Sequence, residues 1–147
     1  MPTLLTALTD PAAAGIFRVP ARLSVVALAR RIAATDARLA LLPGGAITDK
    51  GTFLRAAADA LAFPPYFGRN WDAFADCLTD LSWLPAPGYA ILYDNPAPLI
   101  RQSPQDWAAA AEVFGAAAER WRVAGVPFVV LLRRAAGLAP TIPLLED

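Results

Sequence analysis

Three aspartates, Asp72, Asp76 and Asp80, are spaced four residues apart in the segment Trp71–Leu81. On a helix they would share one face, where like charges at this spacing repel each other by about 0.2–0.5 kcal/mol per pair. Fixed carboxylates can attract a cationic partner, hold a metal ion, or work in pairs as acid and base. The elements around them help to decide which chemistry they serve.

The spacing of the apolar residues predicts that Trp71–Leu81 is an amphipathic helix, for which Asn70 is a suitable N-terminal cap. Its buried face would be formed by Trp71, Phe74, Ala75, Leu78 and Leu81, opposite a face of Asp72, Asp76, Thr79 and Asp80. The simplest alternative is a solvated face. The helix dipole favours a carboxylate at Asp72, in the first turn, but it does not explain Asp80, which lies near the negative C-terminal end.

The segment before this helix adds aromatic and rigid residues. Pro64 and Pro65 favour an extended backbone, and Gly68 permits a tight turn. Between them, Phe67 is expected to pack in the core and Tyr66 to lie at a surface edge. An acidic face bordered by an aromatic residue suits a cationic partner.

Apolar runs that alternate with helical patterns predict an α/β fold, with a small parallel sheet of three to four strands packed with helices. The strands are expected at 15–19, 38–42, 89–93 and 128–132, and the helices at 22–36, 48–63, 71–81 and 105–124. Residues 1–14 are predicted to be a loosely ordered arm, 94–104 a loop and 133–147 a tail. We expect one domain over 1–147, since no repeat or linker is visible.

In the helix over 22–36, the spacing places Leu23, Val26, Ala27 and Ala34 on a common side, and Thr48 or Asp49 is expected to cap the next helix.

The composition excludes several function classes. There is no histidine, the commonest general acid–base residue and metal ligand, and the single cysteine allows neither an internal disulfide nor a cysteine zinc site. The net charge is zero, so any electrostatic function must come from a local patch. The N-terminus is a poor signal peptide and no apolar run is long enough for a membrane span, so we expect a soluble, cytoplasmic protein without cofactors.

The motif residues closely resemble the signature of the barstar-like family of ribonuclease inhibitors. The matching pattern consists of Pro64, Tyr66, Phe67, Gly68, Asn70, Asp72, Ala73, Asp76, Cys77 and Leu78. The order of elements over Arg38–Leu132 is also similar to that of the family. Residues 1–36 are not part of the family's minimal form and are interpreted as an added strand–helix unit.

The resemblance implies an inhibitor, not an enzyme, that binds a small basic ribonuclease and blocks its active site. Asp76 would take the place of an RNA phosphate, facing the nuclease's arginines and catalytic histidine. The other partner-binding positions would be Tyr66, Gly68, Asn70, Asp72, Ala75, Thr79 and Asp80.

The chain departs from the family's namesake at two positions. Ala75 and Leu81 stand where the namesake has tryptophans, although Trp83 is nearby. Glu119 is the nearest counterpart of an acidic residue on the namesake's late helix.

Two other functions remain open. In an enzyme, Asp72 and Asp76 could act with Asp94 as acid and base or as Mg²⁺ ligands. Alternatively, the chain is an interaction module whose partner is not a nuclease. A nucleic-acid partner is disfavoured because an acidic face repels phosphates. Cys77 is interpreted as a packing residue, with reactivity as the alternative, and a monomer is favoured.

Overall fold

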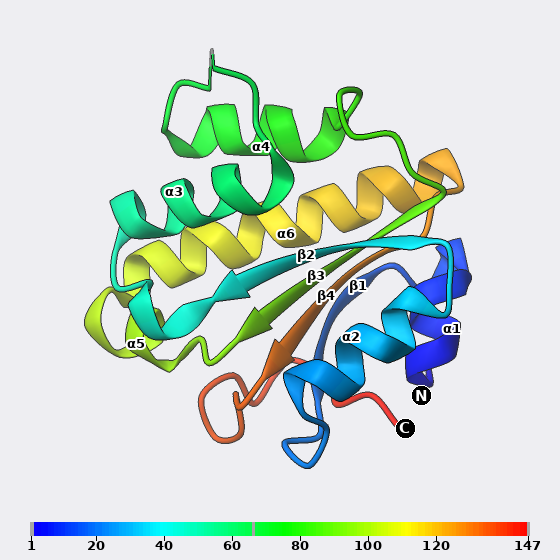
Figure 1. Cartoon of the computed structure of the whole chain (residues 1–147). Coiled ribbons are helices and arrows are strands. Elements are labelled where there is room, and N and C mark those ends of the chain that lie inside the picture. The colour runs from blue at the N-terminus through cyan, green and yellow to red at the C-terminus, as the bar shows by residue number, and fades with distance from the viewer. Residues whose placement is uncertain (1, 66, 147) are drawn as a thin grey trace.

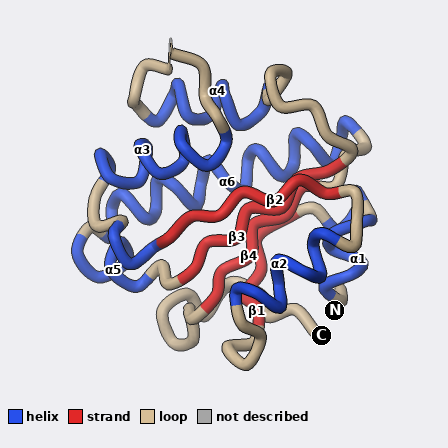
Figure 2. The backbone as a smooth tube through the Cα atoms, viewed as in Figure 1, coloured by secondary structure: helices blue, strands red, loops and turns tan. Residues whose placement is uncertain are grey.

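The computed structural model describes residues 2–65 and 67–146. Within this range, four strands form one parallel sheet in the order β1–β4–β3–β2 (Figures 1 and 2). They are β1 (Gly15–Val19), β2 (Ala37–Pro43), β3 (Gly88–Asp94) and β4 (Phe128–Arg133). The α/β fold class and all four predicted strands are confirmed.

The described chain contains six α-helices. They are α1 (Leu4–Thr9), α2 (Val25–Ala33), α3 (Lys50–Leu61), α4 (Trp71–Asp80), α5 (Ala97–Gln102) and α6 (Pro104–Ala124), with short 3₁₀ turns η1 (Pro11–Ala13) and η2 (Gly44–Ala46). Figure 1 shows α1 and α2 on one side of the sheet and α3, α4 and α6 on the other. None of these helices is both long and apolar enough to cross a bilayer.

The two central strands explain the unbroken apolar runs of the sequence. Side chains of β3 and β4 alternate between two cores, one under α3, α4 and α6 and one under α1 and α2. Tyr93 and Val130 belong to the first core, and Leu92 and Leu131 to the second. Strands covered on both faces need no polar alternation.

The expectation of a loosely ordered arm over 1–14 is wrong. Thr3 caps α1 through its hydroxyl, and Leu4, Ala7 and Leu8 are at most 3% exposed in the second core. Asp10 then caps η1. The helix is only six residues long, too short for its periodicity to be recognised in the sequence.

The predicted loop over 94–104 is also wrong in part, because it contains α5. Pro96 and Pro98 stand at its start, where a missing backbone N–H costs nothing, and Leu99 is buried.

The predicted inner face of the second helix is wrong as well. α2 begins after the Ser24 cap and buries Leu28 and Ile32, whereas Val26 is 60% exposed. The apolar residues of α2 lie on more than one side of the helix, so its inner face is ambiguous from the sequence. The side that faces the core is the one with Leu28 and Ile32, which are four residues apart. In α3 the Asp49 cap is confirmed, with Thr52 completing a capping box.

The N-terminal segment is built into the sheet. β1 pairs with β4, and the C-terminal tail runs along the outer edge of β1. The Arg18 backbone N–H donates to Pro143 O at 2.7 Å, and the Leu145 N–H donates to Arg18 O at 2.8 Å. The guanidinium of Arg18 donates to Ile142 O at 2.7 Å, so backbone and side chain both fix the tail.

Candidate functional site

Helix α4 places three carboxylates on its solvent side, which we call the acidic face: Asp72, Asp76 and Asp80. All three are exposed. The helix begins where the Asn70 side-chain oxygen accepts a hydrogen bond from Ala73 N at 2.8 Å, and it ends at Leu81 in the left-handed conformation. None of the three carboxylates forms an ion pair with a described residue. The face therefore carries unneutralised negative charge.

The opposite side of α4 fixes the helix to the core. Phe74 and Leu78 are fully buried. The Phe74 ring packs edge-on against Phe53 and Phe114, with centroids 5.3 and 5.9 Å apart. The indole of Trp121 on α6 donates to Leu78 O at 2.9 Å. With one side anchored in this way, the acidic face has a fixed position.

The loop that leads into α4 is ordered by local contacts. Phe67 was expected in the core and is half-buried at its edge, where its ring packs on Phe63 with a centroid distance of 4.9 Å. Its N–H donates to Pro64 O at 3.0 Å. Arg69 of this loop is in the left-handed conformation, with φ of 53°, whereas Gly68, which was expected to permit a tight turn, has no positive φ. A Cβ on Gly68 would lie 3.3 Å from the Asn70 side-chain nitrogen, so glycine lets the Asn70 side chain lie close to the backbone at this position. Tyr66 lies outside the described residues.

The comparisons with known proteins add one finding. A model of the family "Barstar (barnase inhibitor)" matches residues 37–133. The chain belongs to the barstar family. The match begins and ends within one residue of the range 38–132 on which the sequence resemblance rests, and it contains the whole of α4 and its approach loop. Comparison with curated proteins gives no match.

At the two positions that differ from the barstar namesake, one side chain is small and the other points into the core. Ala75 is half-buried, and Leu81 is 1% exposed. The indole of Trp83 donates to Leu61 O at 3.0 Å and packs edge-on against Phe63, so it does not replace an aromatic group on the acidic face.

Two further polar groups of the predicted site are turned to local partners. The Thr79 hydroxyl donates to Ala75 O at 2.9 Å, within the helix. Asp80 accepts a hydrogen bond from the Ser82 hydroxyl at 3.2 Å.

Two acidic residues outside the acidic face of this barstar-family chain, Glu119 and Asp94, are paired with arginines. Glu119 accepts two hydrogen bonds from Arg122, at 2.6 and 2.9 Å, and these lower its pKa. Asp94 is paired with Arg133 and Arg134 at 2.9 and 3.0 Å. Asp94 therefore does not join Asp72 and Asp76 as the enzyme alternative required. Among the described residues, no three His, Cys, Asp or Glu side chains are grouped as metal ligands.

Cys77 is a buried packing residue, 6% exposed on the inner side of α4. Burial raises the pKa of its thiol, and the negative charges of Asp76 and Asp80 raise it further. A thiol that stays protonated is a poor nucleophile, which disfavours the reactive alternative.

Proposed function

We propose that this protein inhibits a small basic ribonuclease by placing the acidic face of α4 over the RNA-binding cleft of the enzyme. The observation that carries the proposal is the acidic face itself, in which three exposed aspartates have no ion pair within the described chain. Membership of an inhibitor family supports it. The role requires fixed negative charge and no catalytic group.

Asp76 is the centre of the proposed interface. It stands one helical turn from both Asp72 and Asp80, so a cation over Asp76 is attracted by all three charges. Among the described residues, the Asn70 side-chain nitrogen makes only a long hydrogen bond, 3.4 Å, to Gly68 O, so it can donate to a partner. We expect Gly68, Asn70 and Asp72 to contact the nuclease at the start of α4, and Thr79 and Asp80 at its end. Tyr66 is a further expected contact.

Ala75 sets the shape of this interface. Because its side chain is a single methyl group, position 75 offers no large aromatic anchor next to Asp76. We expect the cognate nuclease to present a larger side chain there than the partner of an inhibitor with tryptophan at this position.

The test is inhibition of RNA cleavage by a panel of small basic ribonucleases, with Asp76→Ala as the main variant. Removing a central interface charge is expected to weaken inhibition about thirtyfold or more. Asp59→Ala is the matched control, since Asp59 is an exposed aspartate of α3 outside the acidic face. Salt should slow association of the wild type, because charge attraction between separated surfaces is screened.

Equal inhibition by Asp76→Ala and wild type would refute the proposed interface. A second function, binding of a basic partner that is not a nuclease, is favoured by the inward position of Trp83 and the burial of Leu81. In that case no nuclease of the panel is inhibited, yet a basic protein is bound in a manner that depends on Asp76.

A further inference from the structure

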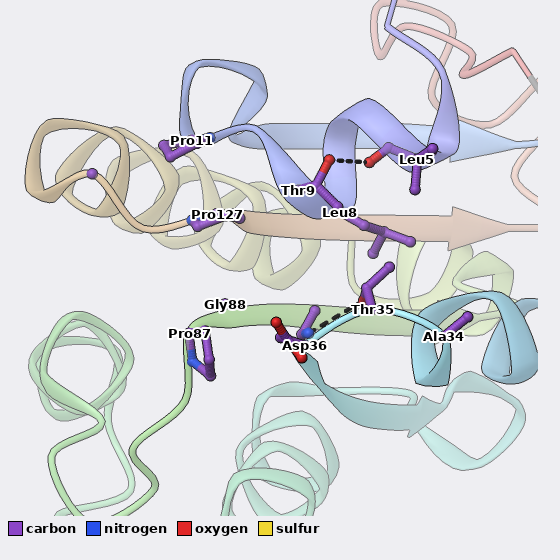
Figure 3. A pocket seen from close by; sticks show the side chains of 12 residues that line it. Leu5, Leu8, Thr9, Pro11, Ala34, Thr35, Asp36, Pro87, Gly88 and Pro127 are labelled. Carbon is purple, nitrogen blue, oxygen red and sulfur yellow. Dashed lines mark hydrogen bonds between the residues drawn. The ribbon is translucent and has the colours of Figure 1, made fainter.

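A cavity of about 450 Å³ lies at the edge of the sheet where β2, β3 and β4 begin. Its walls come from α1, η1, the turn between α2 and β2, the start of β3 and the loop between α6 and β4 (Figure 3). Residues 5–11 and 34–36 of this lining precede the range matched by the barstar family model. The cavity is therefore shaped in part by residues that the family model does not include, together with the strand starts that it does include.

The backbone makes this cavity electrostatically negative. The C-terminal ends of three helices line it, through Thr9 of α1, the α2 cap residue Ala34 and the α6 cap residue Gly125. Each helix end of this kind carries a partial negative charge that favours cations. The Thr9 and Thr35 hydroxyls satisfy two of the carbonyls, donating to Leu5 O and Ile32 O at 2.7 Å each.

One side chain adds a full negative charge. Asp36 lines the cavity, is exposed, and forms no ion pair with a described residue. No Lys or Arg is among the lining residues, and the basic residues in the last turns of α2 and α6, Arg30, Arg31 and Arg122, are outside it. A cation inside the cavity would therefore meet Asp36 and the helix ends, with no Lys or Arg in the wall around it.

The remaining walls are apolar. Leu8, Pro11, Pro87 and Pro127 contribute to them, and Leu5 lines the cavity although 61% of its surface is exposed. Such a side chain gains from being covered. The volume lies in the range of small-molecule sites.

We propose that this cavity binds a small organic cation, a primary amine attached to an apolar body. The apolar part contacts Leu5, Leu8 and the prolines, and the ammonium group lies towards Asp36 and the helix ends. This site is separate from the acidic face of α4, so the proposal does not depend on the inhibitor function.

The test uses phenethylamine as probe, with phenethyl alcohol and hydrocinnamate as neutral and anionic analogues of similar size. Binding to the full chain is followed by backbone amide NMR. The amine is expected to shift the amide signals of Asp36, Gly88 and Gly125 saturably, and to bind about tenfold more tightly than the alcohol. The anion should give no saturable shift.

Two variants make the test specific. Asp36→Asn should weaken amine binding about threefold to fivefold and leave alcohol binding unchanged, whereas the matched change Asp59→Asn on α3 should have no effect. Ala34→Phe, which fills the cavity, should abolish binding of both probes. The proposal is overturned if the amine gives no saturable shift at about 10 mM, if alcohol and amine bind equally, or if the shifted amides belong to α4.

Discussion

The acidic face should lower the stability of the free protein, and Asp76→Asn measures by how much. Asp76 has an aspartate four residues away on each side, and each such pair costs about 0.2–0.5 kcal/mol on an exposed helix. Neutralising Asp76 removes both repulsions, so the free energy of unfolding should rise by about 0.4–1 kcal/mol. Asp and Asn have similar helix propensities, so the change reports the charge.

The two outer aspartates provide internal controls. Asp72→Asn relieves one repulsion but loses a favourable charge in the first turn, worth about 0.3–1 kcal/mol, so its net effect should be near zero or slightly destabilising. Asp80→Asn relieves one repulsion and removes a charge from the negative end of the helix, which gives a gain of about 0.5–1.5 kcal/mol. The expected order of stabilisation is Asp80, then Asp76, then Asp72.

The assay is urea unfolding of wild type and the three variants at low ionic strength, repeated at about 0.5 M salt, where the differences should shrink. If Asp76→Asn lowers the stability at low salt, the carboxylate makes a favourable contact in the free protein, and the reasoning is refuted. If it raises the stability and also weakens nuclease inhibition, the charge is retained for binding at a cost to the fold.

Three further predictions concern buried or half-buried groups. Burial raises the pKa of Asp94, but hydrogen bonds from Arg134 and Arg133 outweigh burial and lower it overall. Asp94→Asn should therefore lower the free energy of unfolding by about 1–3 kcal/mol, measured by urea unfolding at pH 7. The difference from wild type should shrink once the pH is below the ordinary pKa of aspartate, and it should be lost when the pH has passed the lower pKa of Asp94 in the folded protein. The fully buried Tyr93 hydroxyl has no hydrogen-bond partner among described residues, so Tyr93→Phe should leave the unfolding free energy unchanged or raise it by about 1–3 kcal/mol; a clear loss would show that the hydroxyl is satisfied. Cys77 should react with an aromatic disulfide reagent far more slowly in the native than in the urea-unfolded protein, and equal rates would contradict its burial.

The sequence predicted best those elements whose own residues contain the whole pattern, such as a helix cap followed by regularly spaced apolar residues. For α4, the Asn70 cap and the apolar residues Phe74 and Leu78 predicted both the boundaries and the exposed acids. β3 and β4 were recognised because strands covered on both faces are apolar throughout. By contrast, α1 and α5 are six residues long, and their stability comes from tertiary burial that a local pattern does not contain.

The cavity at the start of the strands was not predicted, for a related reason. Its lining comes from the separate ranges 5–11, 34–37, 87–88 and 125–127, each of which contributes a few ordinary residues. Asp36 has no distinguishing neighbours in the sequence. Only the parallel sheet, which gathers the starts of its strands at one edge, brings these ranges together.

The zero net charge of the chain is compatible with a strongly acidic site because the two signs of charge are used differently. Basic side chains support the fold: Arg18 fixes the tail, Arg133 donates to Leu23 O as well as to Asp94, and Arg134 pairs with Asp94. The acidic face has no such pairs within the described chain. Since an exposed charge acts over about a Debye length, roughly 8–10 Å, a partner approaching α4 responds to these local carboxylates and not to the sum over the chain. For the proposed basic partner, the relevant quantity is therefore the unpaired charge on α4, in line with the expectation of a local patch, and not the sum over the chain.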